Sequence, residues 1–258
     1  MVFISISGYS QKDSIVSYLD YNGKITTNKE KAMFFEILTK KSDSLWLARK
    51  YRRNGKLYGY THYLSRLQKN KIGESVVFNK NGDMSALYFY NKEGKRHGKM
   101  QTWFDNGNKN TEGVYLNGKR EGVWKVYYYN GTLAGKGILK NDSIIKSTYY
   151  NNKGEKIDDF TNVIKEKKPT FKEGNDKYYK QLKKLTSKIS YKVKGQIIVE
   201  YVIDVKGQVR DVTISEKIPE KLEKEIVHFF ENLKGWEPAI HMNRKIPFNF
   251  SQPLNFRG

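Results

Sequence analysis

The residues that most often carry catalysis are few in this 258-residue chain, and they are widely separated. The chain has no cysteine, which excludes a thiol nucleophile, a disulfide and a cysteine-type zinc site. The adjacent acidic residues Asp158 and Asp159 stand where the chain turns polar, so we expect both to be solvated. The four histidines are dispersed along the chain and form no recognised metal-binding motif: His62, His97, His228 and His241. We therefore expect no catalytic residue, no metal site and no cofactor.

The last strand offers a different chemistry, that of main-chain hydrogen bonding. Pro247 and Pro253 flank an apolar and polar alternation, and proline is tolerated in edge strands but poorly in central ones. An open edge presents unpaired N–H and C=O groups to an extended peptide. The hypothesis is a strand-pairing site made of Ile246, Phe248, Asn249, Phe250 and Ser251. The alternative, an edge capped by the tail or by another copy of the chain, stays open.

The charge of the chain indicates the kind of partner but not its identity. The formal net charge of +21 arises from 48 Lys and Arg against 27 Asp and Glu, so it favours anionic partners or surfaces. Anionic lipid and cell-wall polymer both fit, as does a merely solvated basic surface. No nucleic-acid-binding module is recognisable, and we expect no nucleic acid partner.

The elements around the last strand form a compact pattern. Residues 196–204, dense in Ile, Val and Tyr, and the alternating residues 209–215 predict two strands about a turn at Gly207. Apolar residues from Ile218 to Leu233 mark one helical face, with Pro219 suited to the first turn and Gly235 to the C-terminal cap. An amphipathic helix is predicted before them, at 176–189. The order is helix, then β-β-α-β.

This stretch resembles the C-terminal domain family of TonB. The residues that carry the resemblance occur in the family's order: Gly195, Gly207, Leu222, the Trp236-Glu237-Pro238-Ala239 run, Asn243, Pro247 and Phe256. The resemblance implies that these are structural residues and that partner proteins bind by adding a strand to the last one. It further implies envelope partners, outer-membrane receptors among them. A TonB energy transducer also has a membrane helix and a long Pro-rich spacer, whereas this chain has 5 Pro and no stretch of 18 apolar residues.

The middle of the chain repeats. Aromatic-x-x-Asn-Gly elements end at Gly82, Gly107 and Gly131, so they recur after 25 and 24 residues. Asn-Gly between β-rich runs predicts hairpins with type I′ turns. The run Gly122 to Leu133 resembles the bacterial variant of the MORN (membrane occupation and recognition nexus) repeat. Most of the repeat aromatics, Trp103, Trp124, Tyr115 and Tyr127, are expected in the core.

We predict a mainly β chain, with an array of antiparallel hairpin repeats followed by an α+β module. The expected divisions are 1–11 as the remnant of a secretion signal or, equally, a first strand; 12–158 as MORN-like repeats; 159–175 as linker; and 176–258 as TonB-like domain. A short helix fits within 28–38.

Three functions remain open at this point. The first is a non-enzymatic periplasmic or envelope interaction protein. The second is a component of TonB-dependent transmembrane transport, anchored by residues that the sequence lacks. The third is an intracellular antitoxin-like MORN-repeat protein. The ligand and the oligomeric state are not given by the sequence.

Overall fold

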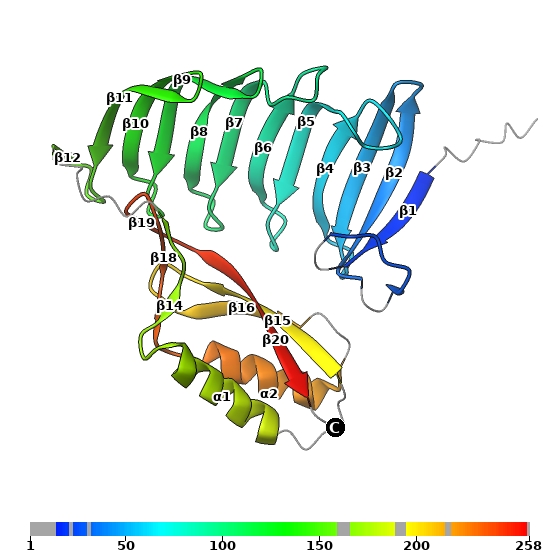
Figure 1. Cartoon of the computed structure of the whole chain (residues 1–258), viewed down its shortest axis with the longest axis vertical. Helices are drawn as coiled ribbons and strands as arrows, with labels where there is room; N and C mark the ends of the chain where they lie inside the picture. The colour runs from blue at the N-terminus through cyan, green and yellow to red at the C-terminus, as the bar shows by residue number, and fades with distance from the viewer. Residues whose placement is uncertain are drawn as a thin grey trace, which may run out of the picture. The chain divides into compact units, whose positions relative to one another are not determined.

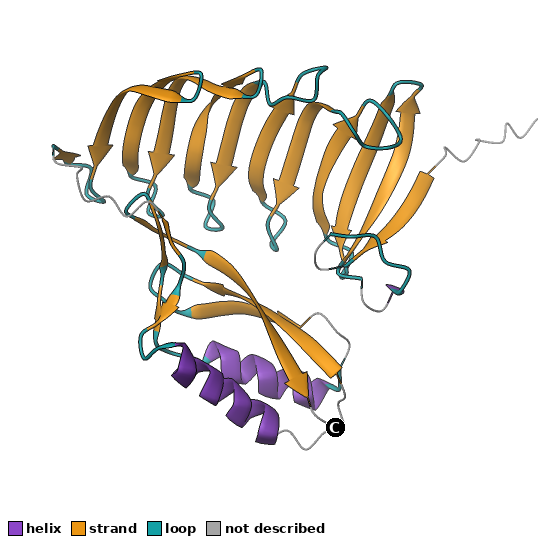
Figure 2. Cartoon of the chain, viewed as in Figure 1, coloured by secondary structure: helices purple, strands orange, loops and turns teal. Residues whose placement is uncertain are grey.

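The computed structural model describes residues 14–20, 23–29, 32–158, 166–188, 195–214 and 218–256. The chain is mainly β, with a twelve-stranded antiparallel sheet followed by a small α+β region that holds two helices (Figures 1 and 2). This confirms the predicted fold class. The predicted secretion signal at 1–11 lies outside the described residues. No described helix is both long enough and apolar enough to span a membrane.

The large sheet is a meander in which each strand pairs with its neighbours in sequence, so the hairpin array is confirmed. Within 28–38, where a short helix is expected, strand β2 takes up residues 34–38. Lys29 is in 3-10 conformation, the Ala32 N–H donates to its carbonyl at 3.3 Å, and residues 30–31 lie outside the described residues. The alternation of Phe34, Glu36 and Leu38 there has the period of a strand. The strands are β1 (Ser14–Leu19), β2 (Phe34–Ser42), β3 (Leu45–Arg52), β4 (Leu57–Tyr63), β5 (Lys71–Phe78), β6 (Met84–Tyr90), β7 (Gly98–Trp103), β8 (Lys109–Leu116), β9 (Lys119–Tyr127), β10 (Leu133–Lys140), β11 (Ser143–Tyr150) and β12 (Lys156–Ile157).

The Asn-Gly turns are of two kinds, which corrects the expectation of type I′ turns throughout. At Gly82, Gly107 and Gly131 only the glycine has a positive φ. In the last of these, Tyr128 N–H donates to the Thr132 carbonyl and Gly131 N–H to the Tyr128 carbonyl, the pattern of a type I turn followed by a left-handed residue. Between β8 and β9 both Asn117 and Gly118 have positive φ, as a type I′ turn requires.

The strands of this sheet form a single layer, and most of its aromatic side chains are therefore only half-buried. Of the four repeat aromatics expected in the core, Trp124 is buried and Trp103, Tyr115 and Tyr127 are intermediate. Trp124 lies on Gly113, where a Cβ would come within 2.2 Å of the indole. Rings and cations cover one another along the layer.

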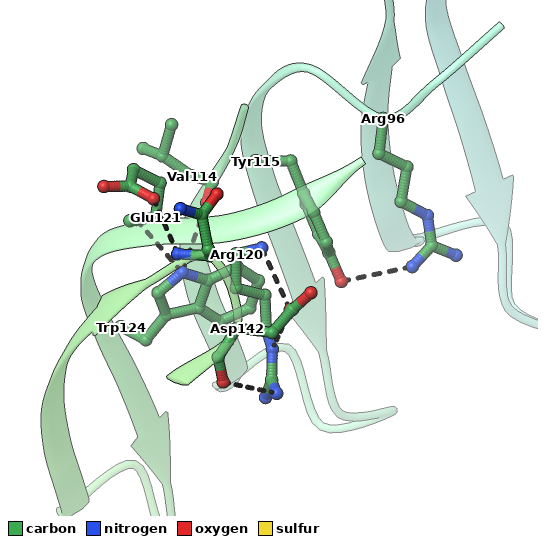
Figure 3. A network of polar contacts seen from close by, with 8 residues as sticks. Arg96, Val114, Tyr115, Arg120, Glu121, Trp124 and Asp142 are labelled. Carbon is green, nitrogen blue, oxygen red and sulfur yellow. Dashed lines mark hydrogen bonds and ion pairs between the residues drawn. The ribbon is translucent and has the colours of Figure 1, made fainter. Parts of the chain in front are cut away.

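Figure 3 shows one such network. Arg96 donates to the Tyr115 hydroxyl at 3.2 Å, and Tyr115 meets the Trp124 ring edge-on at 5.1 Å between centroids. Arg120 pairs with Asp142 at 2.9 Å and lies 5.9 Å from the Trp124 ring. Contacts between neighbouring hairpins thus replace a second layer.

The C-terminal region has one core, formed where its helices meet a three-stranded sheet of order β16-β15-β20. Helices α1 (Asn175–Lys188) and α2 (Glu220–Glu231) confirm the two predicted helices. Small ladders join the remaining strands, β13 with β18 and β19, and β14 with β17. The strands are β13 (Glu166–Lys167), β14 (Thr170–Phe171), β15 (Gly195–Ile203), β16 (Val209–Ile214), β17 (Trp236–Glu237), β18 (Ala239–His241), β19 (Arg244–Ile246) and β20 (Phe248–Phe256).

Part of the segment expected as linker belongs to this fold. Phe171 is buried in the core, packed edge-on against Trp236 at 5.3 Å, and β13 and β14 pair with strands more than sixty residues later. The residues around Phe171, among them Lys167 and Lys172, are polar, which is why this segment has the composition of a linker. Residues 159–165 of the expected linker lie outside the described residues.

Candidate partner-binding edge

Strand β20 is an edge of the three-stranded sheet. It pairs with β15 along its full length, from Phe248 opposite Ile203 to Phe256 opposite Gly195, with no shift of register. Within the described residues no strand pairs with its other side. The edge position that the two prolines predicted is therefore what the structure has.

The strand folds this way because its side chains alternate. Gln252, Leu254 and Phe256 are buried, whereas Ser251 and Asn255 are exposed. The buried set packs into the core beneath α1 and α2, which fixes which face of β20 points inward. A slip by one residue would turn the apolar set to solvent, so the register of the edge is well determined.

Pro253 indicates which main-chain groups face outward. It lies opposite Ile198 in an unbroken ladder, yet it has no N–H to give to β15. In an antiparallel pair, alternate residues point their N–H and C=O away from the partner strand. Pro253 belongs to that alternate set, and so do Asn249 and Ser251. The side-chain amide of Gln252 donates to the Pro253 carbonyl at 2.9 Å, which is consistent with a carbonyl not used by β15.

The edge carries no charge. Nine consecutive residues from Phe248 to Phe256 lack Asp, Glu, Lys and Arg in a chain that is 29% charged. Edge strands are commonly protected from pairing by charged side chains, lysine above all. On β20 the single such device is Pro253.

The opposite edge, β16, is less suited to pairing. It has six residues, and its ladder with β15 is broken by an irregularity between Glu200 and Val202. Asp211 in the middle of β16 has a positive φ of 53°. A bulge of this kind twists a strand and interrupts the row of outward groups.

The structure separates one predicted site residue from the others. Phe248, Asn249, Phe250 and Ser251 lie on β20, but Ile246 lies on β19, where it pairs with Ala239. Pro247 stands between the two strands and ends the first. An incoming strand on the outer side of β20 would therefore meet four of the five residues in one row.

The motif glycine Gly207 is held against Trp236. Gly207 has a φ of +80°, and a Cβ there would lie 2.1 Å from the Trp236 carbonyl oxygen. The Trp236 side chain is 4% exposed and packs on the rings of Phe171, Tyr178 and Phe250 at 5.0–5.4 Å. Among the described residues its indole N–H has no acceptor. Trp236 is thus a core residue, as predicted.

The other motif residues also hold the fold. Asn243 has positive φ in the two-residue turn between β18 and β19, Gly195 opens β15 with a φ of +115°, and Leu222 of α2 is fully buried. Ala239 and Phe256 are buried as well. Pro238 lies beside Gly207, where a Cβ on the glycine would come within 3.8 Å of the proline Cδ. These residues therefore shape the backbone and the core of the domain.

A hydroxyl chain ties β20 to α1 and β15, which sequence reasoning missed. Tyr178 of α1 donates to the Gln252 side-chain oxygen at 2.8 Å and accepts from Tyr201 at 2.9 Å. Burial raises the pKa of both phenols, so they stay protonated and the chain of donors is fixed. Nothing in the spacing of two tyrosines and a glutamine over 74 residues indicates this contact.

Residues 189–257 match the family described as Gram-negative bacterial TonB protein C-terminal. The edge strand and the motif residues above all lie within this matched stretch. Among curated proteins, none matches the chain. The MORN-type assignment of the large sheet remains a prediction.

One solved structure that the chain matches is S. aureus TarM, as a mutant in complex with fondaparinux, α-GlcNAc-glycerol and UDP. Identity is 15%, and the alignment covers 41% of this chain and 18% of the TarM chain at a TM-score of 0.25. A likeness at this level carries no inference about function.

Proposed function

We propose that this chain is a non-enzymatic protein of the cell envelope whose TonB C-terminal domain binds a partner protein by strand addition on the outer side of β20. The observation that carries the proposal is the nine-residue edge without charge and without a break in register. Such an edge offers hydrogen-bonding groups at regular intervals to an extended segment.

This domain then acts in the periplasm, where the family acts, and its partner is an envelope protein such as an outer-membrane receptor. A link to TonB-dependent transport follows from the same family. The net charge of +21 supports additional contact with an anionic lipid or cell-wall surface. No catalytic step is part of this function.

The test is a titration of the full chain with an extended peptide from the periplasmic N-terminal segment of such a receptor, followed by backbone amide shifts. The expected perturbations lie on β20, largest at Asn249 and Ser251, whose N–H groups point outward. Perturbations confined to β16, or none at millimolar peptide, would exclude the site.

A pair of variants at one position separates main-chain pairing from side-chain contact. Ser251→Pro removes an outward N–H while leaving the ladder with β15 intact, as Pro253 already does. Ser251→Ala removes the same hydroxyl and keeps the N–H. In the proline variant the peptide affinity should fall at least tenfold, since two ladder hydrogen bonds of about 0.5–1.5 kcal/mol each are lost or displaced. In the alanine variant the peptide affinity should stay within twofold of the parent's. Equal effects would refute strand addition.

We also propose that the chain divides into two independently folding parts between 158 and 166. Limited proteolysis should then cut in that interval first. Earlier cleavage within Gly98 to Gly131 would contradict the division.

A further inference from the structure

The large sheet holds a cavity that the strand-addition function does not use. Its volume is about 670 Å³, and its lining comes from β1 to β5 and from the two loops that precede β2 and β5. Cavities of roughly 300–1,000 Å³ are the size of small-molecule sites. It lies wholly in the first part of the chain and is independent of the C-terminal edge.

The hollow results from small side chains in cross-strand rows. Ser17 lies opposite Glu36, Glu36 opposite Lys50, and Lys50 opposite Gly59, so the four share one face of the sheet. Ser17 and Gly59 leave space on either side of the charged pair. Gly59 cannot be replaced easily, because a Cβ there would lie 2.4 Å from the Val76 carbonyl oxygen.

Apolar residues supply the floor and the rim. In the neighbouring row Leu38 lies opposite Ala48, and both are buried. At the rim Ile25 and Leu67, one on each loop, leave 76% and 73% of their surface exposed. Large apolar side chains with that exposure at the mouth of a cavity are the kind of feature that marks a binding site.

One loop is fastened across the sheet by its own side chain. Gln68 has a positive φ of 54° and donates from its amide to the Glu36 carboxylate at 2.5 Å. Leu64 N–H closes the base of the loop by donating to the Asn70 carbonyl at 2.9 Å. The wall of the cavity is therefore largely formed before any ligand arrives, which lowers the cost of binding.

Among the described residues, the cations of the lining have no hydrogen-bond acceptor, whereas its carboxylate, Glu36, has a donor in the Gln68 amide. The Lys50 ammonium lies 4.1 Å from the centre of the Phe34 ring and 5.2 Å from that of Tyr58, and within the described part of the chain it has no hydrogen-bond acceptor. Arg66, on the loop with Gln68, likewise has none there. Burial lowers the pKa of Lys50, Glu36 opposes that shift, and Arg52 adds to it.

We propose that this cavity binds a small organic monoanion, a carboxylate carried on an apolar body. The carboxylate accepts from Lys50 and Arg66, and the body lies on Leu38 and Ala48 beneath Ile25 and Leu67. Two cations and one carboxylate leave the lining with a single positive charge, which one negative charge neutralises. A dianion would leave the cavity with excess negative charge, and the net positive charge of the lining would repel a cation.

The first experiment is calorimetric titration of the full chain with decanoate, decanol and decyltrimethylammonium, which share a chain length and differ in charge. Decanoate should bind at one molecule per chain, at least tenfold more tightly than either of the others. Equal affinity for decanoate and decanol, or no binding of decanoate at millimolar concentration, would overturn the proposal.

Variants locate the site. Lys50→Met keeps the apolar stem and removes the charge, so decanoate affinity should fall about tenfold, as loss of one charged hydrogen bond gives. Lys71→Met is the matched control, because Lys71 lies over the Tyr90 ring at 5.2 Å, as Lys50 lies over rings, but outside the cavity. The decanoate affinity of Lys71→Met should stay within twofold of the parent's, and a loss of affinity equal to that of Lys50→Met would refute the site.

Two further variants cover a failure of Lys50→Met to fold and test the apolar half. Arg66 and Leu67 are exposed, so their replacement leaves the fold intact. Arg66→Gln should lower the affinity for decanoate about threefold, and Leu67→Ser should lower it about fivefold. Decanoate affinity unchanged in both would contradict the placement of the ligand.

Discussion

Replacing Trp236 by alanine removes the centre of the aromatic cluster that joins the C-terminal strands to α1. Trp236 contacts Phe171, Tyr178 and Phe250, and its side chain is 4% exposed. These neighbours come from three different elements, β14, α1 and β20. The cavity left by alanine cannot be filled by the movement of any one of them.

The magnitude follows from three terms. Truncation of a buried Trp to Ala costs about 3–5 kcal/mol, and that includes three aromatic pairs worth about 0.5–1.5 kcal/mol each. The indole N–H is buried without an acceptor among the described residues, and such a group costs about 1–3 kcal/mol in the native state. Alanine removes this cost, so we expect a loss near the lower end, about 3 kcal/mol. Trp236→Phe keeps a ring and removes the N–H, and it should lose less than about 1.5 kcal/mol.

Native-state hydrogen exchange of the α2 amides in the full chain measures the opening free energy of this domain alone, since Ile226 and Phe230 of α2 are fully buried. A loss of about 3 kcal/mol also lowers the melting temperature of a domain of this size by more than about 10 °C. A change below about 1 kcal/mol for the alanine variant would refute the core role. If Trp236→Phe lost as much opening free energy as Trp236→Ala, the cost assigned to the buried indole N–H would be refuted.

Two further outcomes are expected. Gly207→Ala should destabilise the domain by about 2–5 kcal/mol, because it combines a left-handed φ with a clash against the Trp236 carbonyl. The control is Gly174→Ala, where φ is +85° and nothing lies within 4 Å, and it should lose only about 1–2 kcal/mol in the same exchange measurement. Equal losses in the two variants would show that the contact with Trp236 does not constrain Gly207. Hydrogen bonds from Lys167 and Thr170 hold the pKa of Glu237 below its usual 4.5. The contribution of Glu237 to stability is therefore present above about pH 4.5 and is lost as the pH falls through the lower pKa of the folded state. The melting temperature of Glu237→Gln should lie below that of the parent at pH 7 and converge with it in acid, and a difference that stays constant with pH would contradict this linkage.

The sequence predicted the C-terminal fold well because each element there carries its own signal. The spacing of Leu222, Ile226 and Phe230 is helical, and the turn at Gly207 separates two alternating strands. The edge position of the last strand followed from a chemical property of Pro253, the missing N–H. Ile246 was misplaced because Pro247, which ends β19, looked like a residue within one continuous strand.

What could not be predicted depends on contacts between distant residues. Whether Asn-Gly forms a type I′ turn is decided by the length of the loop between paired strands, which differs between Gly82 and Gly118. The polar residues around Phe171 concealed a strand whose partner lies at Trp236. The cavity is assembled from residues spread between 15 and 77, and no local pattern indicates it.

The sequential order of β1 to β12 makes the large sheet one-dimensional in its strand pairing, because each strand is paired only with the one or two strands beside it in sequence. Removing or duplicating one interval of 24 or 25 residues, a complete pair of strands, would restore the same neighbours on both sides of the joint. The length of this sheet can therefore change by whole hairpins during evolution or by design without a change of topology. Loss of strands near β1 would abolish the cavity, whereas loss of hairpins between β7 and β10 would shorten the sheet and leave the cavity intact.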